Sequence, residues 1–205
     1  MTPDMRNHWD SVYGRRAANE LSWFEGRPSR SLDMIAVTEV SPASAVIDVG
    51  GGASTLVDEL LARDFTDLTV LDVSEEVLAK VGARLGERQR HVTLLQHDIT
   101  TFRPVNRYAL WHDRAVFHFL TIAADRTRYR DVLREATMLG SHVIIATFGP
   151  EGPTRCSGLE TLRYDASTLA AELGSGFELA NSSIDSHTTP SGVRQQFLHT
   201  HFVRR

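Results

Sequence analysis

Cysteine is nearly absent from this chain of 205 residues, since Cys156 is the only one. A single cysteine excludes an internal disulfide and a cysteine-rich zinc site, and it favours a cytoplasmic chain. Long apolar runs are also missing, because stretches such as Val143–Ala146 are far too short to cross a bilayer. The first residues lack the charged and then apolar pattern of a secretory signal, so none is expected.

Positive charge is not in excess either. The chain has 22 basic and 26 acidic residues and a formal net charge of −4, which gives no general attraction to nucleic acid or to an anionic membrane. Lys80 is the only lysine, an imbalance that compositional bias explains most simply. Apolar residues make up 41% and charged residues 23%, an ordinary globular balance that excludes wholesale disorder.

Short apolar runs alternate with stretches of helical periodicity. The runs expected to form strands are Val46–Val49, Leu68–Leu71, Val92–Leu95, Tyr108–Trp111 and His142–Phe148. Continuous apolar strands that alternate with helices are typical of a parallel sheet buried on both faces. Near the C-terminus, Phe177–Ser186 and Val193–Val203 flank a turn signal and predict an antiparallel hairpin. The predicted fold class is therefore α/β: a doubly wound, mostly parallel seven-stranded sheet with a C-terminal antiparallel hairpin and N-terminal helices.

Capping and stop residues bound three of the expected helices. Ser74 caps the one through Leu85, Asp165 caps the one through Leu173, and Gly140 ends the one around Leu133. Two more helices, Asn7–Arg16 and Ser31–Val40, are expected before the first strand. The length favours one domain, 1–205, in which 1–42 forms a helical cover or lid and 43–205 forms the core.

A glycine-rich segment follows the first expected strand directly. It reads Asp48-Val49-Gly50-Gly51-Gly52-Ala53-Ser54-Thr55, and a helix capped within Thr55–Asp58 is expected after it. Glycines in such a place let the backbone turn sharply and let a ligand approach closely. Asp72 ends the second strand, 20 residues beyond Gly52, where a carboxylate can accept both hydroxyls of a ribose. Together these features favour nucleotide-like binding over a turn that serves only packing.

The loop does not fit a dinucleotide or a triphosphate. The dinucleotide fingerprint needs a glycine at position 55, which is threonine, and no Gly-Lys-Ser/Thr loop is present. The core Asp48-x-Gly50-x-Gly52 instead resembles motif I of the class I S-adenosylmethionine-dependent methyltransferases, with Ser54 at the family's third glycine. The resemblance covers essentially the whole chain, including the closing hairpin. It implies an enzyme with S-adenosylmethionine as cofactor and S-adenosylhomocysteine as product.

The resemblance also implies a role for each matching residue. Those expected around the methionine portion and the sulfonium are Asp48, Gly50, Gly51, Gly52 and Ser54. Those expected at the ribose and the adenine are Asp72, Val73, His97, Asp98 and Ile99, and Asp113 is expected beside them at the end of the fourth strand. For Asp98, contact with the adenine amino group is weighed against a simple turn or helix cap.

The N-terminal text resembles a smaller subgroup of the class. His8-Trp9-Asp10-Ser11-Val12-Tyr13 and Leu21-Ser22-Trp23-Phe24-Glu25 are similar to segments of the citrate synthase lysine methyltransferase and its bacterial relatives. This similarity implies a protein lysine as the methyl acceptor. A small molecule is the alternative, because substrate identity in such folds depends on lids and loops.

Candidates for the chemistry lie after the fourth strand and in the N-terminal segment. Methyl transfer needs an aligned nucleophile, and it needs a base only where the nucleophile is protonated. His112 is a candidate base, or a histidine that only hydrogen-bonds a neighbouring loop, and Asp113 is a candidate for orienting an incoming amine. Trp23 and Phe24 are expected to wall the acceptor or simply to pack in the core, and His118 is a weaker candidate there.

No metal site is expected, although the spacing of His187, His199 and His201 permits one, because a fourth ligand is not apparent. Cys156 reads as an ordinary loop cysteine. Two further function classes stay open: an NAD(P)-dependent oxidoreductase, which Thr55 and the hairpin oppose, and a non-catalytic S-adenosylmethionine-binding protein. The expected partners are a protein lysine or a small-molecule methyl acceptor, with no nucleic acid and no membrane, and the sequence says nothing of oligomeric state.

Overall fold

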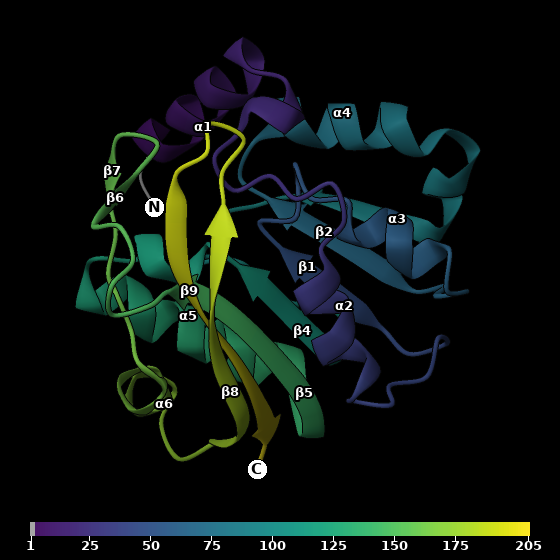
Figure 1. The fold of residues 1–205 in the computed structure, drawn as a ribbon. Helices are drawn as coiled ribbons and strands as arrows, with labels where there is room; N and C mark the ends of the chain where they lie inside the picture. Colours follow the sequence, from purple (N-terminus) through teal and green to yellow (C-terminus); the bar gives the residue numbers. More distant parts are fainter. Residues whose placement is uncertain (1–2) are drawn as a thin grey trace.

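One seven-stranded sheet organises the chain in the computed structural model, which describes residues 3–205 (Figure 1). Its strands are β1 (Val46–Val49), β2 (Leu68–Asp72), β3 (Val92–Gln96), β4 (Tyr108–Arg114), β5 (Thr137–Phe148), β8 (Phe177–Thr188) and β9 (Arg194–Arg204). They lie in the order β3-β2-β1-β4-β5-β9-β8. Strands β1 to β5 pair in parallel, whereas β9 pairs antiparallel with both β5 and β8. The predicted fold class is confirmed.

Helices cover both faces of this sheet. The α-helices are α1 (Pro3–Arg15), α2 (Ser29–Ala36), α3 (Leu56–Leu61), α4 (Glu75–Leu85), α5 (Ala123–Ala136) and α6 (Ala166–Leu173). Short 3₁₀ helices are η1 (Ala18–Glu20), η2 (Gly86–His91) and η3 (Phe117–Phe119), and a small separate hairpin consists of β6 (Arg155–Cys156) and β7 (Leu159–Glu160). Ser74 and Asp165 cap α4 and α6 as predicted, each accepting a hydrogen bond from a backbone N–H of the first turn.

Several predicted boundaries and one predicted cap differ from the structure. Helix α5 ends at Ala136 and β5 starts at Thr137, so Gly140 lies inside the strand, with a φ of 85°, and stops no helix. Helix α2 ends at Ala36, short of the expected Val40. The side chain of Thr55 caps nothing at the start of α3. Ser54 takes that role, since its Oγ accepts a hydrogen bond from the backbone N–H of Leu56 at 3.0 Å.

Successive side chains of the central strands enter two different cores, because a strand presents alternate residues to opposite faces. Those that pack with α2, α3 and α4 are Val46, Leu110 and Ile144; those that pack with α5 and α6 are Ile47, Trp111 and Val143. Figure 1 shows these two groups of helices on either side of the sheet. Within residues 3–205, no helix has both the length and the apolar character that crossing a bilayer requires.

A chain of buried hydrogen bonds ties β4 to α5. The indole Nε1 of Trp111 donates to the hydroxyl of Tyr129 at 2.9 Å, and that hydroxyl donates to Asp113 Oδ2 at 2.7 Å. All three side chains are fully buried. A buried polar group that loses its partner costs more than the hydrogen bond contributes, so this chain fixes how the end of β4 sits against α5.

We expect Tyr129→Phe to lower the free energy of unfolding by about 1–3 kcal/mol, because it leaves a buried indole N–H and a buried carboxylate oxygen unpaired. Tyr164→Phe is the matched control. The hydroxyl of Tyr164 is buried and has no partner among the described residues, so its removal should change stability by less than about 0.5 kcal/mol. Urea unfolding of both variants measures the difference, and equal losses would show that the hydrogen-bonded chain adds nothing.

Candidate cofactor and acceptor site

The glycine loop after β1 passes directly over two buried carboxylates. Gly50 has a φ of 68°, in the left-handed region that favours glycine. A Cβ on Gly51 would fall 2.3 Å from Asp48 Oδ2, and one on Gly52 would fall 2.7 Å from Asp72 Oδ2. Packing inside the protein therefore requires glycine at these positions, and the loop presents bare backbone to whatever lies above it.

Asp72 ends β2 and holds the loop from below. Its Oδ2 accepts a hydrogen bond from the N–H of Gly52 at 3.2 Å, and its Oδ1 accepts one from the N–H of Ser74 at 3.0 Å. Burial raises the pKa of this carboxyl to about 6, and the nearby charge of Asp48 contributes to the rise. Asp72 is thus an ionised acceptor above that pH, and it lines the cavity described below.

Asp48 is paired with His112 across neighbouring strands. The two residues are register partners on β1 and β4, and His112 Nδ1 donates to Asp48 Oδ1 at 2.7 Å. The other ring nitrogen, Nε2, lies 2.9 Å from the hydroxyl oxygen of Ser31 on α2. Both nitrogens of His112 are therefore engaged with the protein. This geometry favours the alternative of a histidine that positions neighbouring elements, and the role of base stays a prediction.

Asp113 is placed away from any open surface. It is fully buried; its Oδ1 accepts from the N–H of Val116 at 2.9 Å, and its Oδ2 accepts from Tyr129. Burial raises its pKa to about 6. The side chain lines neither of the two hollows described below, and both its oxygens accept from the fold, so the arrangement gives Asp113 a positioning role for the loop after β4. Its predicted contacts with cofactor and acceptor are not part of this arrangement.

The main cavity opens over the carboxyl ends of the central strands. The wall nearest the glycine loop consists of Val49, Gly50, Leu71, Asp72, Val73, His97 and Ile99. The rest of the lining, which we call the aromatic half, comprises Met5, Trp9, Tyr13, Trp23, Phe119, Phe148 and Phe197, together with Arg114, Ala115, Val116, His118 and Cys156. The cavity therefore has one polar, loop-lined half and one aromatic half.

The residues predicted at the adenine divide between cavity wall and turn. Val73, His97 and Ile99 line the main cavity. One carboxylate oxygen of Asp98 accepts from the backbone N–H and the hydroxyl of Thr100, each at 2.8 Å. That contact is the simple turn weighed against the ligand role. Contact of Asp98 with an adenine stays a prediction.

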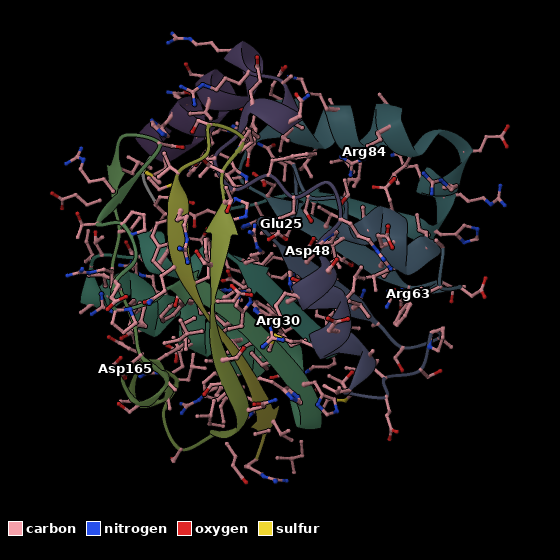
Figure 2. The ribbon with its side chains drawn as sticks, viewed as in Figure 1. Glu25, Arg30, Asp48, Arg63, Arg84 and Asp165 are labelled. Atoms are coloured by element: carbon pink, nitrogen blue, oxygen red, sulfur yellow. The ribbon has the colours of Figure 1, made fainter. Side chains whose placement is uncertain are left out.

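A second hollow adjoins the main cavity on the other side of the glycine loop. Its lining is Trp23, Phe24, Glu25, Pro28, Asp48, Gly50, Gly51, Ala53, Ser54, His112 and Arg114. Trp23, Gly50 and Arg114 line both spaces. Figure 2 shows Glu25 beside Asp48, so the second hollow contains two carboxylates. Asp48 Oδ2 is buried and has no partner among residues 3–205.

An ion pair and hydrogen bonds fasten residues 21–25, a segment of the predicted cover 1–42, to the sheet. Arg114 donates to the carbonyl of Trp23 at 2.9 Å and to Glu25 Oε1 at 2.8 Å. His187 on β8 hydrogen-bonds the carbonyl of Ser22 at 2.8 Å and lies 3.6 Å from the same Glu25 oxygen. Burial raises the pKa of Glu25, but His187 and Arg114 outweigh it and the pKa is lowered. The cover thus rests over the place where the two hollows meet.

The three histidines considered for a metal do not converge. His199 Nε2 lies 3.1 Å from Asp185, His201 is paired with His142, and His187 contacts Ser22. Over the described residues 3–205, no group of three metal-ligating side chains lies close enough to hold an ion.

Cys156 is not an ordinary loop cysteine. It is buried on β6 and lines the main cavity, where burial raises the pKa of its thiol. The cavity is also lined by Arg114, Phe148 and Phe197, which no sequence motif indicates as site residues. They lie at the ends of strands that pair from distant parts of the chain, so no local spacing indicates them.

Comparisons with known proteins agree with this architecture. No established family profile matches the chain. A structure solved for the conversion of a disulfide bond into a thioacetal group during echinomycin biosynthesis has a TM-score of 0.80 at 15% identity, over 98% of this chain and 91% of that one. The N-methyltransferase NodS of Bradyrhizobium japonicum, in complex with S-adenosylhomocysteine, has a TM-score of 0.72 at 19% identity, over 95% and 97%. The glycopeptide N-methyltransferase MtfA, with S-adenosylmethionine, has a TM-score of 0.68 at 17% identity, over 89% and 96%.

This chain has the class I methyltransferase fold. The resemblance stated for the glycine loop is confirmed at that level. One curated relative, the eEF1A lysine and N-terminal methyltransferase of Mus musculus, is 25% identical over 96 residues. The match covers 46% of this chain and 13% of that protein, so the activity and substrates of the whole relative do not transfer directly. The smaller subgroup suggested by the N-terminal text stays a prediction.

We expect His112→Ala to lower the free energy of unfolding by about 1–3 kcal/mol, because Asp48 would keep a buried charge with no donor. Ser31→Ala removes only the hydroxyl beyond the ring, and it should cost about 1 kcal/mol or less. Chemical denaturation measures both. If His112→Ala unfolds like the parent protein and loses only activity, the histidine acts as a base and does not position Asp48.

Proposed function

We propose that this protein is an S-adenosylmethionine-dependent methyltransferase that transfers a methyl group to a nucleophilic nitrogen, oxygen or sulfur. The observation that carries the proposal is the junction of the two hollows at Gly50, Trp23 and Arg114. The lining residues of one hollow suit a nucleoside, and those of the other suit a charged amino-acid group. A ligand with those two ends places its central sulfur at the junction, beside the aromatic half of the main cavity.

The loop-lined half of the main cavity suits an adenosine group. Asp72 supplies an ionised acceptor for ribose hydroxyls, which donate hydrogen bonds. Val73 and Ile99 supply apolar surface on which a flat ring can pack. No side chain of the glycine loop stands between ribose and backbone, since glycines occupy positions 50 to 52.

The second hollow suits the amino-acid end of the same ligand. Its lining carboxylates, Asp48 and Glu25, complement an ammonium group, and Asp48 Oδ2 is buried with no partner among the described residues. A buried carboxylate oxygen without a partner carries a desolvation cost that a bound ammonium would offset. The lining cation, Arg114, complements a carboxylate.

The aromatic half of the main cavity would hold the methyl acceptor. When bound, S-adenosylmethionine supplies a methyl group on a positively charged sulfur. The protein's contribution is then to exclude water and to align the acceptor. Alignment alone can raise the rate of the reaction by several orders of magnitude, without any proton transfer. Trp9, Trp23 and Phe119 form edge-to-face contacts that close this space from the cover side.

Three alternatives remain: an NAD(P)-dependent oxidoreductase, a methyltransferase of protein lysine and a non-catalytic binding protein. An NAD(P)-dependent oxidoreductase lacks support from the loop, because position 55 is threonine. A protein lysine as acceptor draws on the N-terminal text and on the name of the mouse relative, which matches less than half of this chain. A non-catalytic binding protein would show the same cofactor affinity and no turnover on any acceptor.

We expect isothermal titration to give a dissociation constant for S-adenosylhomocysteine in the micromolar range, with no binding of NADH. Asp72→Asn should weaken this binding by about 10- to 100-fold, because it replaces a charged hydrogen-bond acceptor by a neutral one. Binding of NADH in place of S-adenosylhomocysteine would reject the proposed function.

The same titration should depend on pH in a defined direction. Only the ionised form of Asp72 is a full acceptor for ribose hydroxyls, and burial raises its pKa to about 6. Affinity should therefore be complete above about pH 7 and fall as the pH drops through 6. Asp113→Asn is the control, since burial raises that pKa to about 6 too but the side chain lies outside both hollows. A pH profile that moves with Asp113 and not with Asp72 would contradict the assignment.

A further inference from the structure

His118 is a buried polar residue in the aromatic half of the main cavity, and it has no part in the cofactor contacts proposed above. It lies on η3, is completely buried and stacks on Phe148 with 4.4 Å between ring centroids. Its ring also lines the main cavity. Its Nε2 is buried and has no hydrogen-bond partner among residues 3–205. A buried polar atom without a protein partner calls for a partner from outside the protein.

The fold fixes which nitrogen of His118 carries the proton. The backbone N–H of Phe148 donates to Nδ1 at 3.1 Å, so Nδ1 is an acceptor and bears no hydrogen. Burial, together with the charge of Arg114, lowers the pKa of this histidine to about 3, so the ring is neutral. A neutral ring that accepts at Nδ1 must carry its proton on Nε2. His118 therefore offers the cavity a hydrogen-bond donor and no base.

One carboxylate and one cation line the main cavity among the described residues, and neither is directed at the acceptor. Asp72 belongs to the loop-lined half, and Arg114 is ion-paired with Glu25 at 2.8 Å. His118 Nε2 is therefore the polar group that decides which acceptor fits the aromatic half. An ammonium group has no lone pair to accept a hydrogen bond from this N–H. An anion can accept it, and a hydrogen bond to a charged acceptor is the stronger kind.

We propose that the aromatic half of the main cavity selects a small aromatic or apolar molecule with an ionisable thiol or phenol, bound as its anion, whose sulfur or oxygen accepts a hydrogen bond from His118 Nε2. This substrate class rests on the proposed function. It disfavours a protein lysine, which would enter as an ammonium group. The cavity wall built from Trp9, Trp23 and Phe197 supplies the matching apolar surface.

The reaction then balances without a base in the protein. The thiol or phenol loses its proton to solvent before binding. A lone pair on its sulfur or oxygen forms the bond to the methyl carbon as the bond from that carbon to the sulfonium breaks. The bonding pair stays on the departing sulfur, so a negative nucleophile and a positive sulfonium give two neutral products. His118 stabilises the anionic form of the acceptor through the proton on its Nε2.

Two coloured probes test the substrate class on the whole protein saturated with S-adenosylhomocysteine. 4-Nitrophenol and 4-nitrothiophenol absorb differently as neutral molecules and as anions, and they separate the oxygen and sulfur cases. We expect at least one of them to bind and to show its anion band below its solution pKa. Benzylamine, as its ammonium form, should bind at least about tenfold more weakly. Tighter binding of the ammonium, binding of the probes only as neutral molecules, or no binding of either probe would overturn the proposal.

A matched pair of variants isolates Nε2. His118→Asn keeps an acceptor near Nδ1 for the N–H of Phe148 and loses the donor, whereas His118→Gln keeps a donor near Nε2 and loses that acceptor. We expect His118→Asn to weaken probe binding by about 10- to 100-fold and His118→Gln to weaken it much less, with affinity for S-adenosylhomocysteine unchanged in both. Equal effects of the two variants would contradict the role of Nε2.

The proposal and the function it rests on fail separately. Calorimetry with S-adenosylhomocysteine alone reads the cofactor site and does not involve the probes. Loss of that binding in the parent protein rejects the proposed function. Normal cofactor binding, together with methyl transfer to a lysine peptide and none to a thiol or phenol, rejects only the substrate class. If His118→Asn does not fold, the spectra of the probes on the parent protein still decide the question.

Discussion

The close packing of a loop without side chains on two buried carboxylates sets the rest of this site. Asp48 lies one residue before the end of β1, and Asp72 ends the neighbouring parallel strand β2, so both lie at the same edge of the sheet. A Cβ on Gly51 or Gly52 would collide with one or the other. Each acid packs against the loop and also lines a hollow: Asp72 lines the main cavity and Asp48 lines the second hollow. The two hollows meet at Gly50, Trp23 and Arg114, which line both.

Buried polar groups at this edge mostly hold elements of the fold in place. His112 joins Asp48 to α2, and Asp113 joins the loop after β4 to Tyr129 on α5. Both nitrogens of His112 and both carboxylate oxygens of Asp113 are thereby engaged within the protein. A site of this kind suits a reaction in which alignment and exclusion of water supply most of the rate, because such a reaction needs no proton transfer from the enzyme. It also makes the ionisation state of the acceptor decisive.

Most of the fold could be predicted from the chain itself, because parallel strands buried on both faces have continuous apolar runs that periodicity detects. The run at residues 46 to 49 matches β1 residue for residue. The start of β5 was missed because Thr137 follows α5 without a break, and a glycine that looked like a helix stop sits within the strand. Capping by Ser54 in place of Thr55 depends on side-chain geometry that spacing alone does not determine.

The candidate site also has one part that the sequence predicts and one part that it does not. Its loop-lined half comes from short motifs at strand ends, so Gly50 and Asp72 could be identified from spacing and context. Its aromatic half is assembled from the N-terminal helix, η3, β6 and β9, which lie far apart along the chain. Residues such as Phe197 and Cys156 have no local signature of that role. His118, the weaker candidate in the sequence, lines the cavity, whereas Asp113, the stronger candidate, does not.

The segment of residues 21–25 completes the site, because its Trp23 lines both hollows.

A crystal structure of the protein with bound S-adenosylhomocysteine tests the central claim most directly. The account predicts the ribose on Asp72, the amino-acid end in the hollow of Asp48 and Glu25, and the sulfur between them beside the aromatic wall. A ligand that leaves Asp72 without a ribose contact, or that binds outside both hollows, would contradict it.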